Sequence, residues 1–157
     1  LRIKVEDSDK AVNKLVLTGQ QVIIFKNLKQ VKKQELYEFS QIRIINAPVL
    51  ESIEQEGMYW CFSMIYLLAP RLQSIGETSM CSNRCIKSIV LNIKYLSQWA
   101  FVHCTGLLFV QMNQVEVIKE HCFRNCSSLQ TAIFHSATII ENQAFYECAS
   151  LAYMEIP

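Results

Sequence analysis

The residues best suited to chemistry in this 157-residue chain are seven cysteines and three histidines. Two pairs of cysteines are four residues apart, Cys81/Cys85 and Cys122/Cys126, close enough for a disulfide or for two metal ligands on one turn. No second ligand pair is placed to complete a tetrahedral zinc site, so we expect no metal and no cofactor. The pattern leaves open whether Cys81 and Cys85 are paired or are two free thiols.

Catalysis would require a nucleophile with a positioned base, and the sequence offers little support for one. His103 and Cys104 are adjacent, but neighbouring side chains in a turn usually point apart. The chain contains no G-x-S-x-G, phosphate-binding loop, H-E-x-x-H or G-x-G-x-x-G motif. We therefore expect a protein that is not an enzyme.

Composition indicates one globular domain. Hydrophobic residues make up 51% and charged residues 18%, which excludes a disordered chain. The formal net charge is +1, without the basic stripe of a nucleic-acid-binding protein. The longest apolar run, residues 58–69, is too short to cross a bilayer. We expect no nucleic-acid partner and no membrane insertion by this segment.

A repeat of about 22 residues organises residues 21–157. Its large apolar position recurs in steps of 22, 22, 21, 22 and 22, at Leu36, Met58, Met80, Phe101, Phe123 and Phe145. An aliphatic residue precedes each by five positions, and a Leu-like residue follows each by six. Six frames in register predict a solenoid, because one repeat cannot bury its apolar face alone. Residues 1–20 fit poorly, and we interpret them as a degenerate first coil or an N-terminal cap.

Each frame predicts one strand and one compact turn. After the Leu-like residue, apolar residues recur at every second position, as at Ile89 and Leu91, which is the period of a strand with one buried face. Proline at positions 48, 70 and 157 ends the strand. From the aliphatic position to the position three after the large apolar residue, which is often cysteine, the spacing of the apolar residues predicts a short helical or 3₁₀ turn. The expected fold class is an α/β repeat, a solenoid with a one-sided parallel β-sheet.

The frame L-x-x-I-x-x-x-A-F-x-x-C-x-S-L-x-x-I-x-I-P resembles the BspA-like leucine-rich repeat. Residues 118–129 and 140–157 match it best, whereas earlier frames depart from it, with Leu36 and Met58 in place of phenylalanine. The resemblance covers about residues 20–157. It implies a horseshoe-like or nearly straight leucine-rich-repeat solenoid, of a surface-protein type found in bacteria and parasitic protists. Adhesion or binding is implied, and no binding residue is transferred, because the repeat positions are structural.

Four cysteines share one position of the repeat, namely Cys61, Cys104, Cys126 and Cys148. We predict a buried ladder of thiols, each donating a weak hydrogen bond to the turn backbone. Successive rungs point the same way, so disulfides between them are not expected. Asn83 occupies the same slot and supports this interpretation, since its amide can satisfy the same backbone groups.

The outward face of the strands is the candidate binding surface. Seven of its twelve positions are apolar or aromatic, and a contiguous exposed patch of this kind usually marks a partner site. The candidate partner-binding residues are Ile44, Tyr66, Leu68, Val90, Phe109, Ile133 and Tyr153. The three aromatic residues would be the anchors. The alternative explanation is β-propensity, because strands favour such residues even where they are exposed.

Together these features predict a non-enzymatic module that binds a protein or glycan through its sheet, in adhesion at a cell surface or outside the cell. The alternative is a cytoplasmic scaffold or regulatory interaction module on the same fold, which free thiols slightly favour. A structural spacer that binds nothing is a third hypothesis. Pro157 ends the last frame in register without a polar cap. We therefore expect further repeats, or end-to-end self-association through the open C-terminal edge.

Overall fold

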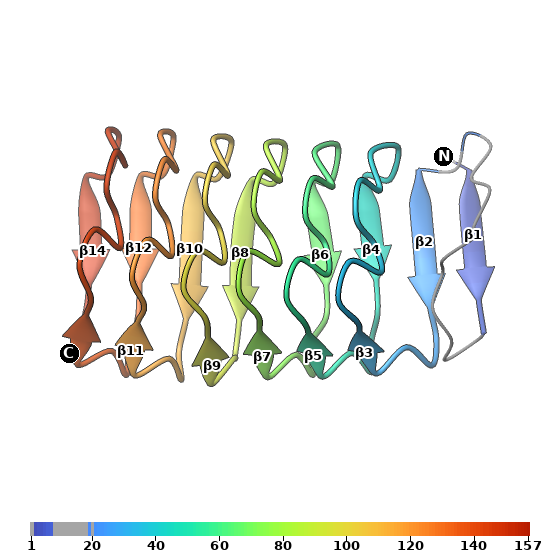
Figure 1. Ribbon diagram of the computed structural model, residues 1–157, viewed down its shortest axis with the longest axis horizontal. Coiled ribbons are helices and arrows are strands. Elements are labelled where there is room, and N and C mark those ends of the chain that lie inside the picture. The colour runs from blue at the N-terminus through green and yellow to red at the C-terminus, as the bar shows by residue number, and fades with distance from the viewer. Residues whose placement is uncertain (1, 8–18, 20) are drawn as a thin grey trace.

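The computed structural model describes residues 2–7, 19 and 21–157. The chain winds into a row of stacked coils that runs from the N-terminal to the C-terminal end (Figure 1). Every pair of hydrogen-bonded strands in the described residues is parallel, as the predicted solenoid requires.

The larger strands form the main sheet and confirm the predicted period. They are β1 Ile3–Glu6, β2 Val22–Phe25, β4 Ile44–Asn46, β6 Tyr66–Leu68, β8 Ser88–Leu91, β10 Phe109–Met112, β12 Thr131–Ile133 and β14 Tyr153–Glu155. Along β8, Ile89 and Leu91 are buried, while Val90 between them is 63% exposed. The strands β4, β6 and β14 each end before the predicted proline.

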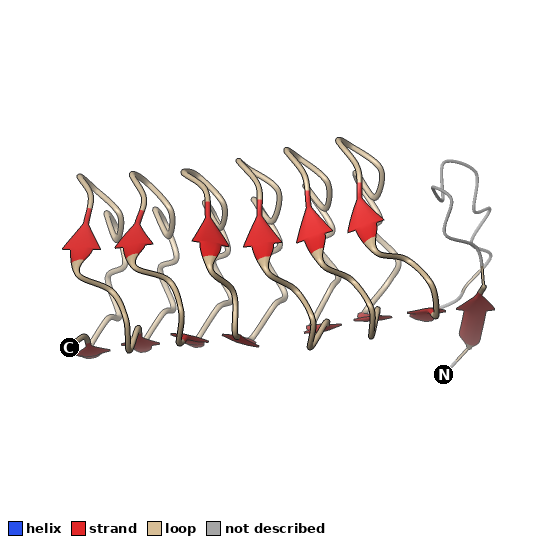
Figure 2. Ribbon diagram, turned by 90° about the horizontal axis from the view of Figure 1, so that it is seen from below, coloured by secondary structure: helices blue, strands red, loops and turns tan. Residues whose placement is uncertain are grey.

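The expectation of a one-sided sheet is wrong, because a second parallel ladder runs along the solenoid. Its two-residue strands are β3 Gln30–Val31, β5 Ser52–Ile53, β7 Ser74–Ile75, β9 Tyr95–Leu96, β11 Val117–Ile118 and β13 Ile139–Ile140. Figure 2 shows the two rows of strands lying apart along the solenoid. Each short strand ends with the aliphatic residue of the repeat, which is buried in every coil except the last. These aliphatic residues therefore belong to strands and not to the start of a helical turn.

The predicted helical or 3₁₀ turns are also wrong, since the described residues contain no helix. Each turn instead holds two residues in the left-handed region, as at Trp99 (φ 61°) and His103 (φ 58°). Backbone N–H groups there bond to the next coil and not along a helix: Trp99 N–H donates to Glu120 O at 3.2 Å, and Phe101 N–H donates to Cys122 O at 2.8 Å. A left-handed residue with a side chain costs about 1 kcal/mol, which these bonds between coils offset.

The one 21-residue step of the repeat changes how the coils pair. It falls at the corner between β8 and β9. The strand β8 is hydrogen-bonded only to β10, whereas β9 is hydrogen-bonded only to β7. We attribute this arrangement to the shortened corner. The main sheet is consequently interrupted between β6 and β8, and the second ladder between β9 and β11 (Figure 1).

The shortened repeat also brings one turn unusually close to the previous coil, at Gly106. A Cβ on Gly106 would lie 2.2 Å from the backbone oxygen of Arg84. The same slot of the next coil holds Ser128, whose side chain is accommodated. We expect Gly106→Ala to lower the free energy of unfolding by about 2–3 kcal/mol, because the backbone itself must shift. The control Ser128→Ala should change it by less than about 0.5 kcal/mol. Urea denaturation followed by circular dichroism measures both, and equal losses would contradict this explanation.

The N-terminal segment has one described strand. β1 pairs in register with β2, from Ile3 opposite Val22 to Glu6 opposite Phe25. Residues 8–18, which make up most of the proposed degenerate coil or cap, lie outside the described residues. The domain boundary near residue 20 stays a proposal.

Candidate functional site

The structure places all seven sequence-predicted site residues on the outward side of the main sheet. Tyr66, Leu68, Val90 and Tyr153 are 48–63% exposed, and Ile44, Phe109 and Ile133 are half-buried. The predicted alternation of buried and outward side chains is therefore confirmed, whereas their role in binding a partner stays a prediction.

Four of these residues lie together at the centre of the solenoid. Ile44 is directly opposite Tyr66 on the neighbouring strand. Leu68 and Val90 both line a groove of about 520 Å³ at the interruption between β6 and β8. The rest of the groove is formed by Asn46, Pro48, Leu67, Ala69, Pro70, Leu91, Asn92 and Asn113. The interruption in the sheet thus creates a concave feature beside an exposed apolar cluster.

The other three predicted residues are separated from this cluster by polar neighbours. Phe109 is opposite Ser88 on one side and Thr131 on the other. Tyr153 is also opposite Thr131, and its hydroxyl donates to Glu155 Oε2 at 2.8 Å. This hydrogen bond to the carboxylate raises the pKa of Tyr153. The face is therefore apolar near β4, β6 and β8 and mixed toward the C-terminal end.

The predicted cysteine ladder is confirmed by its hydrogen bonds. Each thiol donates to the backbone oxygen of the residue 25 positions earlier: Cys61 to Leu36 at 3.0 Å, Cys126 to Phe101 at 3.2 Å, and Cys148 to Phe123 at 3.1 Å. Cys104 makes the corresponding contact with Met80 O, at 3.2 Å and 24 residues away, because the shortened repeat lies between them. Asn83 replaces the thiol with its amide, which donates to Met58 O at 3.2 Å.

Burial makes most of the buried cysteines poor nucleophiles, whereas Cys148 is half-buried and its hydrogen bond with Cys126 lowers its pKa. Burial raises the pKa of the Cys61 thiol to about 12, and it also raises the pKa of Cys104, Cys122 and Cys126. The thiolate is the reactive form of cysteine, so these four thiols are suited to packing and not to catalysis.

Cys81 and Cys85 are free thiols in different environments. Cys81 is only 6% exposed, and burial raises its pKa. Cys85 is exposed and lines a pocket of about 430 Å³ with Trp60, Phe62, Ser82 and Arg84, here called the turn-edge pocket. Sequence reasoning missed this pocket because Trp60 and Phe62 come from one coil and Arg84 from the next. The available signal was the run of aromatic residues at turn positions 37, 59 and 60.

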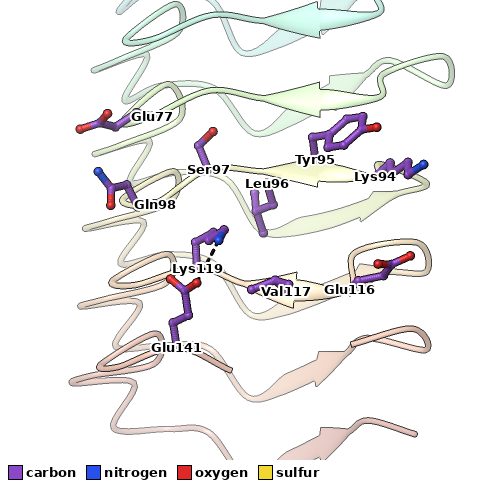
Figure 3. Close-up of a pocket in the computed structure, with 10 residues that line it drawn as sticks. All are labelled: Glu77, Lys94, Tyr95, Leu96, Ser97, Gln98, Glu116, Val117, Lys119 and Glu141. Atoms are coloured by element: carbon purple, nitrogen blue, oxygen red, sulfur yellow. Dashed lines mark hydrogen bonds and ion pairs between the residues drawn. The ribbon is translucent and has the colours of Figure 1, made fainter. Parts of the chain in front are cut away.

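A second pocket, of about 590 Å³, lies where the second ladder is interrupted between β9 and β11 (Figure 3). Its charged lining consists of Glu77, Lys94, Glu116, Lys119 and Glu141. Lys119 Nζ contacts Glu141 Oε1 at 2.9 Å, and this hydrogen bond lowers the pKa of Glu141. Because carboxylates and ammonium groups are mixed, the pocket favours no single sign of ligand charge.

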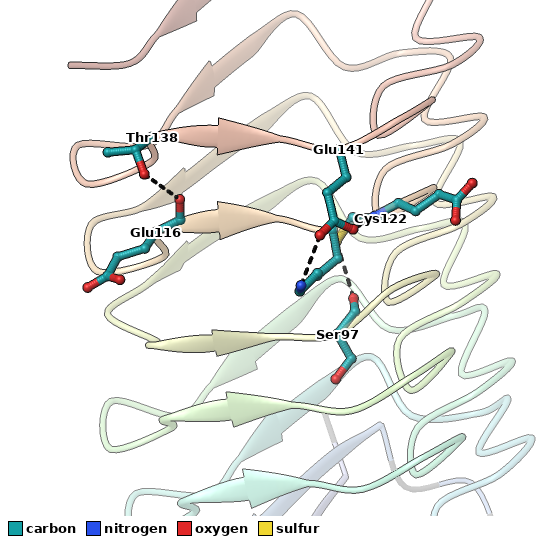
Figure 4. A network of polar contacts seen from close by, with 7 residues as sticks. Ser97, Glu116, Cys122, Thr138 and Glu141 are labelled. Atoms are coloured by element: carbon teal, nitrogen blue, oxygen red, sulfur yellow. Dashed lines mark hydrogen bonds and ion pairs between the residues drawn. The ribbon is translucent and has the colours of Figure 1, made fainter.

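Polar contacts tie the coils together around this interruption (Figure 4). Glu120 N–H donates to Glu141 Oε2 at 3.0 Å, and Thr138 Oγ1 donates to Glu116 O at 3.5 Å. Cys122 Sγ donates to Ser97 O at 3.6 Å. This contact joins the two coils whose short strands, β9 and β11, are not hydrogen-bonded to each other. These contacts indicate a structural role for the network.

Two further properties concern metals and membranes. Within the described ranges, no group of three or more His, Cys, Asp or Glu side chains is arranged to hold a metal ion. The same part of the chain has no helix that is long and apolar enough to cross a bilayer.

A comparison with protein families identifies the same repeat. The model for the BspA-type leucine-rich repeat region, with six copies, matches residues 16–130 and 109–157. The chain belongs to the BspA-type leucine-rich repeat family. A search of curated proteins finds no match.

Solved leucine-rich repeat structures share the fold. A leucine-rich repeat protein of T. pallidum is 18% identical with a TM-score of 0.66, over 85% of this chain and 79% of that one. A leucine-rich cell surface protein of Faecalibacterium prausnitzii is 12% identical with a TM-score of 0.50, over 87% of this chain. This chain spans 59% of the F. prausnitzii protein. The family's repeats form a scaffold, and at these identities the two structures support the fold alone.

Proposed function

We propose that this BspA-type repeat region is a non-enzymatic binding module that presents the outward face of its main sheet to a protein or glycan at a cell surface. The observation that carries this proposal is the exposed cluster of Tyr66, Leu68 and Val90 beside the groove between β6 and β8. Apolar side chains around a concave feature are typical of the centre of an interface. A rigid strand array loses little ordering entropy on binding, which favours affinity.

Adhesion and a surface location are supported by one structural comparison. The F. prausnitzii protein that shares the fold is described as a cell surface protein. Antibody labelling of intact, unpermeabilised source cells tests this part of the proposal. Labelling of intact cells supports a surface adhesin, whereas labelling only after permeabilisation rejects it.

The alternative is a scaffold inside the cell, and one observation favours it. All seven cysteines are free, and proteins exported to oxidising compartments commonly use cysteine in disulfides. If labelling requires permeabilisation, cytosolic partners become the next search.

The binding role of the sheet is tested by changing its exposed side chains together. We expect the combination Tyr66→Ser, Leu68→Ser and Val90→Ser to abolish binding of a partner found for the wild-type module. The matched control is Lys29→Ser with Gln114→Ser, two exposed polar residues away from the sheet face. Both proteins must retain the wild-type circular dichroism spectrum. Unchanged binding by a folded triple variant would reject the sheet face as the site.

A further inference from the structure

We propose that the turn edge of the solenoid carries a second binding site, separate from the sheet face, and that its ligand is an acidic glycan. The site consists of the turn-edge pocket together with the neighbouring aromatic cluster of Tyr37, Tyr59 and Trp60. It goes beyond the function proposed for the sheet, because none of its residues belongs to a strand of the main sheet.

The aromatic cluster is a group of stacked and tilted rings whose outer surface, here called the platform, is exposed at the turn edge. The rings of Tyr37 and Tyr59 have centroids 5.4 Å apart and planes 12° apart, although they come from successive coils. Tyr59 and Trp60 have centroids 5.5 Å apart and planes 21° apart. Trp60 is 40% exposed and the adjacent Phe62 is 45% exposed. The C–H faces of sugar rings carry slight positive charge and stack on the negative face of aromatic rings, so such a platform suits a saccharide.

The platform is fixed by the backbone beneath it. Trp60 has a left-handed φ of 58°, and its N–H donates to Cys81 O on the next coil at 3.1 Å. A ligand would therefore meet a surface that is already ordered, and binding would require little additional ordering of the protein.

The charge at the pocket favours an anion. Arg84 is the only charged side chain that lines the turn-edge pocket, and it forms no ion pair with the described residues. Lys87 adds positive charge at the same edge. Gly106 packs against the backbone oxygen of Arg84, and Lys87 Nζ would lie 3.4 Å from a Cβ atom on Gly106. A guanidinium binds a carboxylate through two parallel hydrogen bonds, which gives a carboxylated sugar an advantage over a neutral one.

The backbone of the turn disfavours an extended peptide as the ligand. Peptides that bind by strand addition need a row of unpaired backbone groups. Here Trp60 N–H bonds to Cys81 O, Ser82 N–H bonds to Val102 O at 2.8 Å, and Arg84 N–H bonds to Ser82 O at 3.0 Å. The side chains left for a ligand are aromatic rings, the Arg84 guanidinium and the Cys85 thiol, a combination suited to the mixed apolar and polar surface of an acidic sugar.

Two sugars that differ by an acidic residue test the proposal: sialyllactose and lactose. A Trp99→Phe background leaves Trp60 as the only tryptophan, so its fluorescence reports on the platform. Alkylation of Cys85 by iodoacetamide, located by peptide mass spectrometry, gives a second readout from the pocket wall. We expect sialyllactose to change the emission of Trp60 and to slow alkylation of Cys85, with lactose at least about tenfold weaker.

Variants separate the parts of the site. Arg84→Gln should remove the preference for the acidic sugar, and Trp60→Ala should remove the protection of Cys85 by sialyllactose. Tyr153→Ser on the sheet face should alter neither readout, so this test can fail or succeed independently of the function proposed for the sheet. Circular dichroism confirms that each variant is folded.

Three outcomes would overturn the proposal. The first is equal binding of lactose and sialyllactose, which would remove the role of charge. The second is absence of binding by both sialyllactose and a hyaluronan hexasaccharide, a second acidic probe. The third is tighter binding of a glutamate- and tyrosine-rich peptide than of either acidic sugar, which would assign the pocket to a protein ligand.

Discussion

Raising the pH from 9 to 10 is expected to destabilise the folded protein steeply, because four buried cysteines hold their protons. Cys61, Cys104, Cys122 and Cys126 are at least nine-tenths buried, and burial raises the pKa of each above the ordinary value of 9.0. Below pH 9 the folded and unfolded chains both bind these protons, so stability does not depend on them. Above pH 9 the unfolded chain releases them while the folded chain retains them, and unfolding is favoured.

The expected slope is large for a domain of this size. Well above pH 9, each such thiol contributes a loss of about 1.4 kcal/mol per pH unit, so the four together contribute about 5.6 kcal/mol per unit. Typical domains have a total stability of 5–15 kcal/mol, so unfolding by about pH 11 is expected. Urea denaturation at half-unit pH intervals, with a non-thiol reductant present, measures the slope. The range below pH 10 is the informative one, because burial also raises the pKa of Tyr59 from its ordinary value of 10.0.

A single substitution isolates the contribution of one rung. Cys104→Ala should reduce the slope by about one quarter, whatever its effect on the stability at neutral pH. The control Cys85→Ala removes a thiol that is exposed and does not belong to the buried set. A stability that stays constant between pH 8 and pH 10 would contradict the retention of protons by the four buried cysteines.

Truncating the central ring of the phenylalanine stack is expected to cost about 3–5 kcal/mol of unfolding free energy. Phe123 is fully buried, with the rings of Phe101 and Phe145 each 5.3 Å away and nearly parallel to it. The ring of Phe134 meets it edge-on at 5.7 Å. Phe123→Ala would remove contacts with the coils on both sides, and a coil held between two neighbours cannot easily collapse into the resulting cavity.

Phe123→Leu is the matched control for this prediction. Leucine occupies the same repeat position at Leu36, so the coil can accommodate it, and we expect a loss below about 1.5 kcal/mol. Thermal and urea denaturation of both variants provide the measurement. A loss of less than 2 kcal/mol for Phe123→Ala would show that the coils repack locally and that the stack is not a continuous core.

The sequence by itself determined the repeat, the parallel main strands, their buried side and the cysteine ladder. These features depend on patterns that recur within each coil. A residue such as Ile89 is buried because its strand has period two, and Cys126 reaches the previous turn because every coil places that position alike. Asn83 was predictable for the same reason, since its amide could replace a thiol donor.

Only the tertiary structure decided the turns, the second ladder and the two interruptions. Trp99 and His103 adopt a left-handed φ although neither is glycine, so the sequence does not predict this conformation. Their backbone N–H groups are held by hydrogen bonds to residues 21 positions away. The coil that contains β8 and β9 pairs with one neighbour through β8 and with the other through β9, whereas the sequence shows only a missing residue. The pocket beside Trp60 likewise forms because stacking places Arg84 next to it. A local pattern specifies what each coil can form, whereas contacts between coils select the backbone conformation and the surfaces that result.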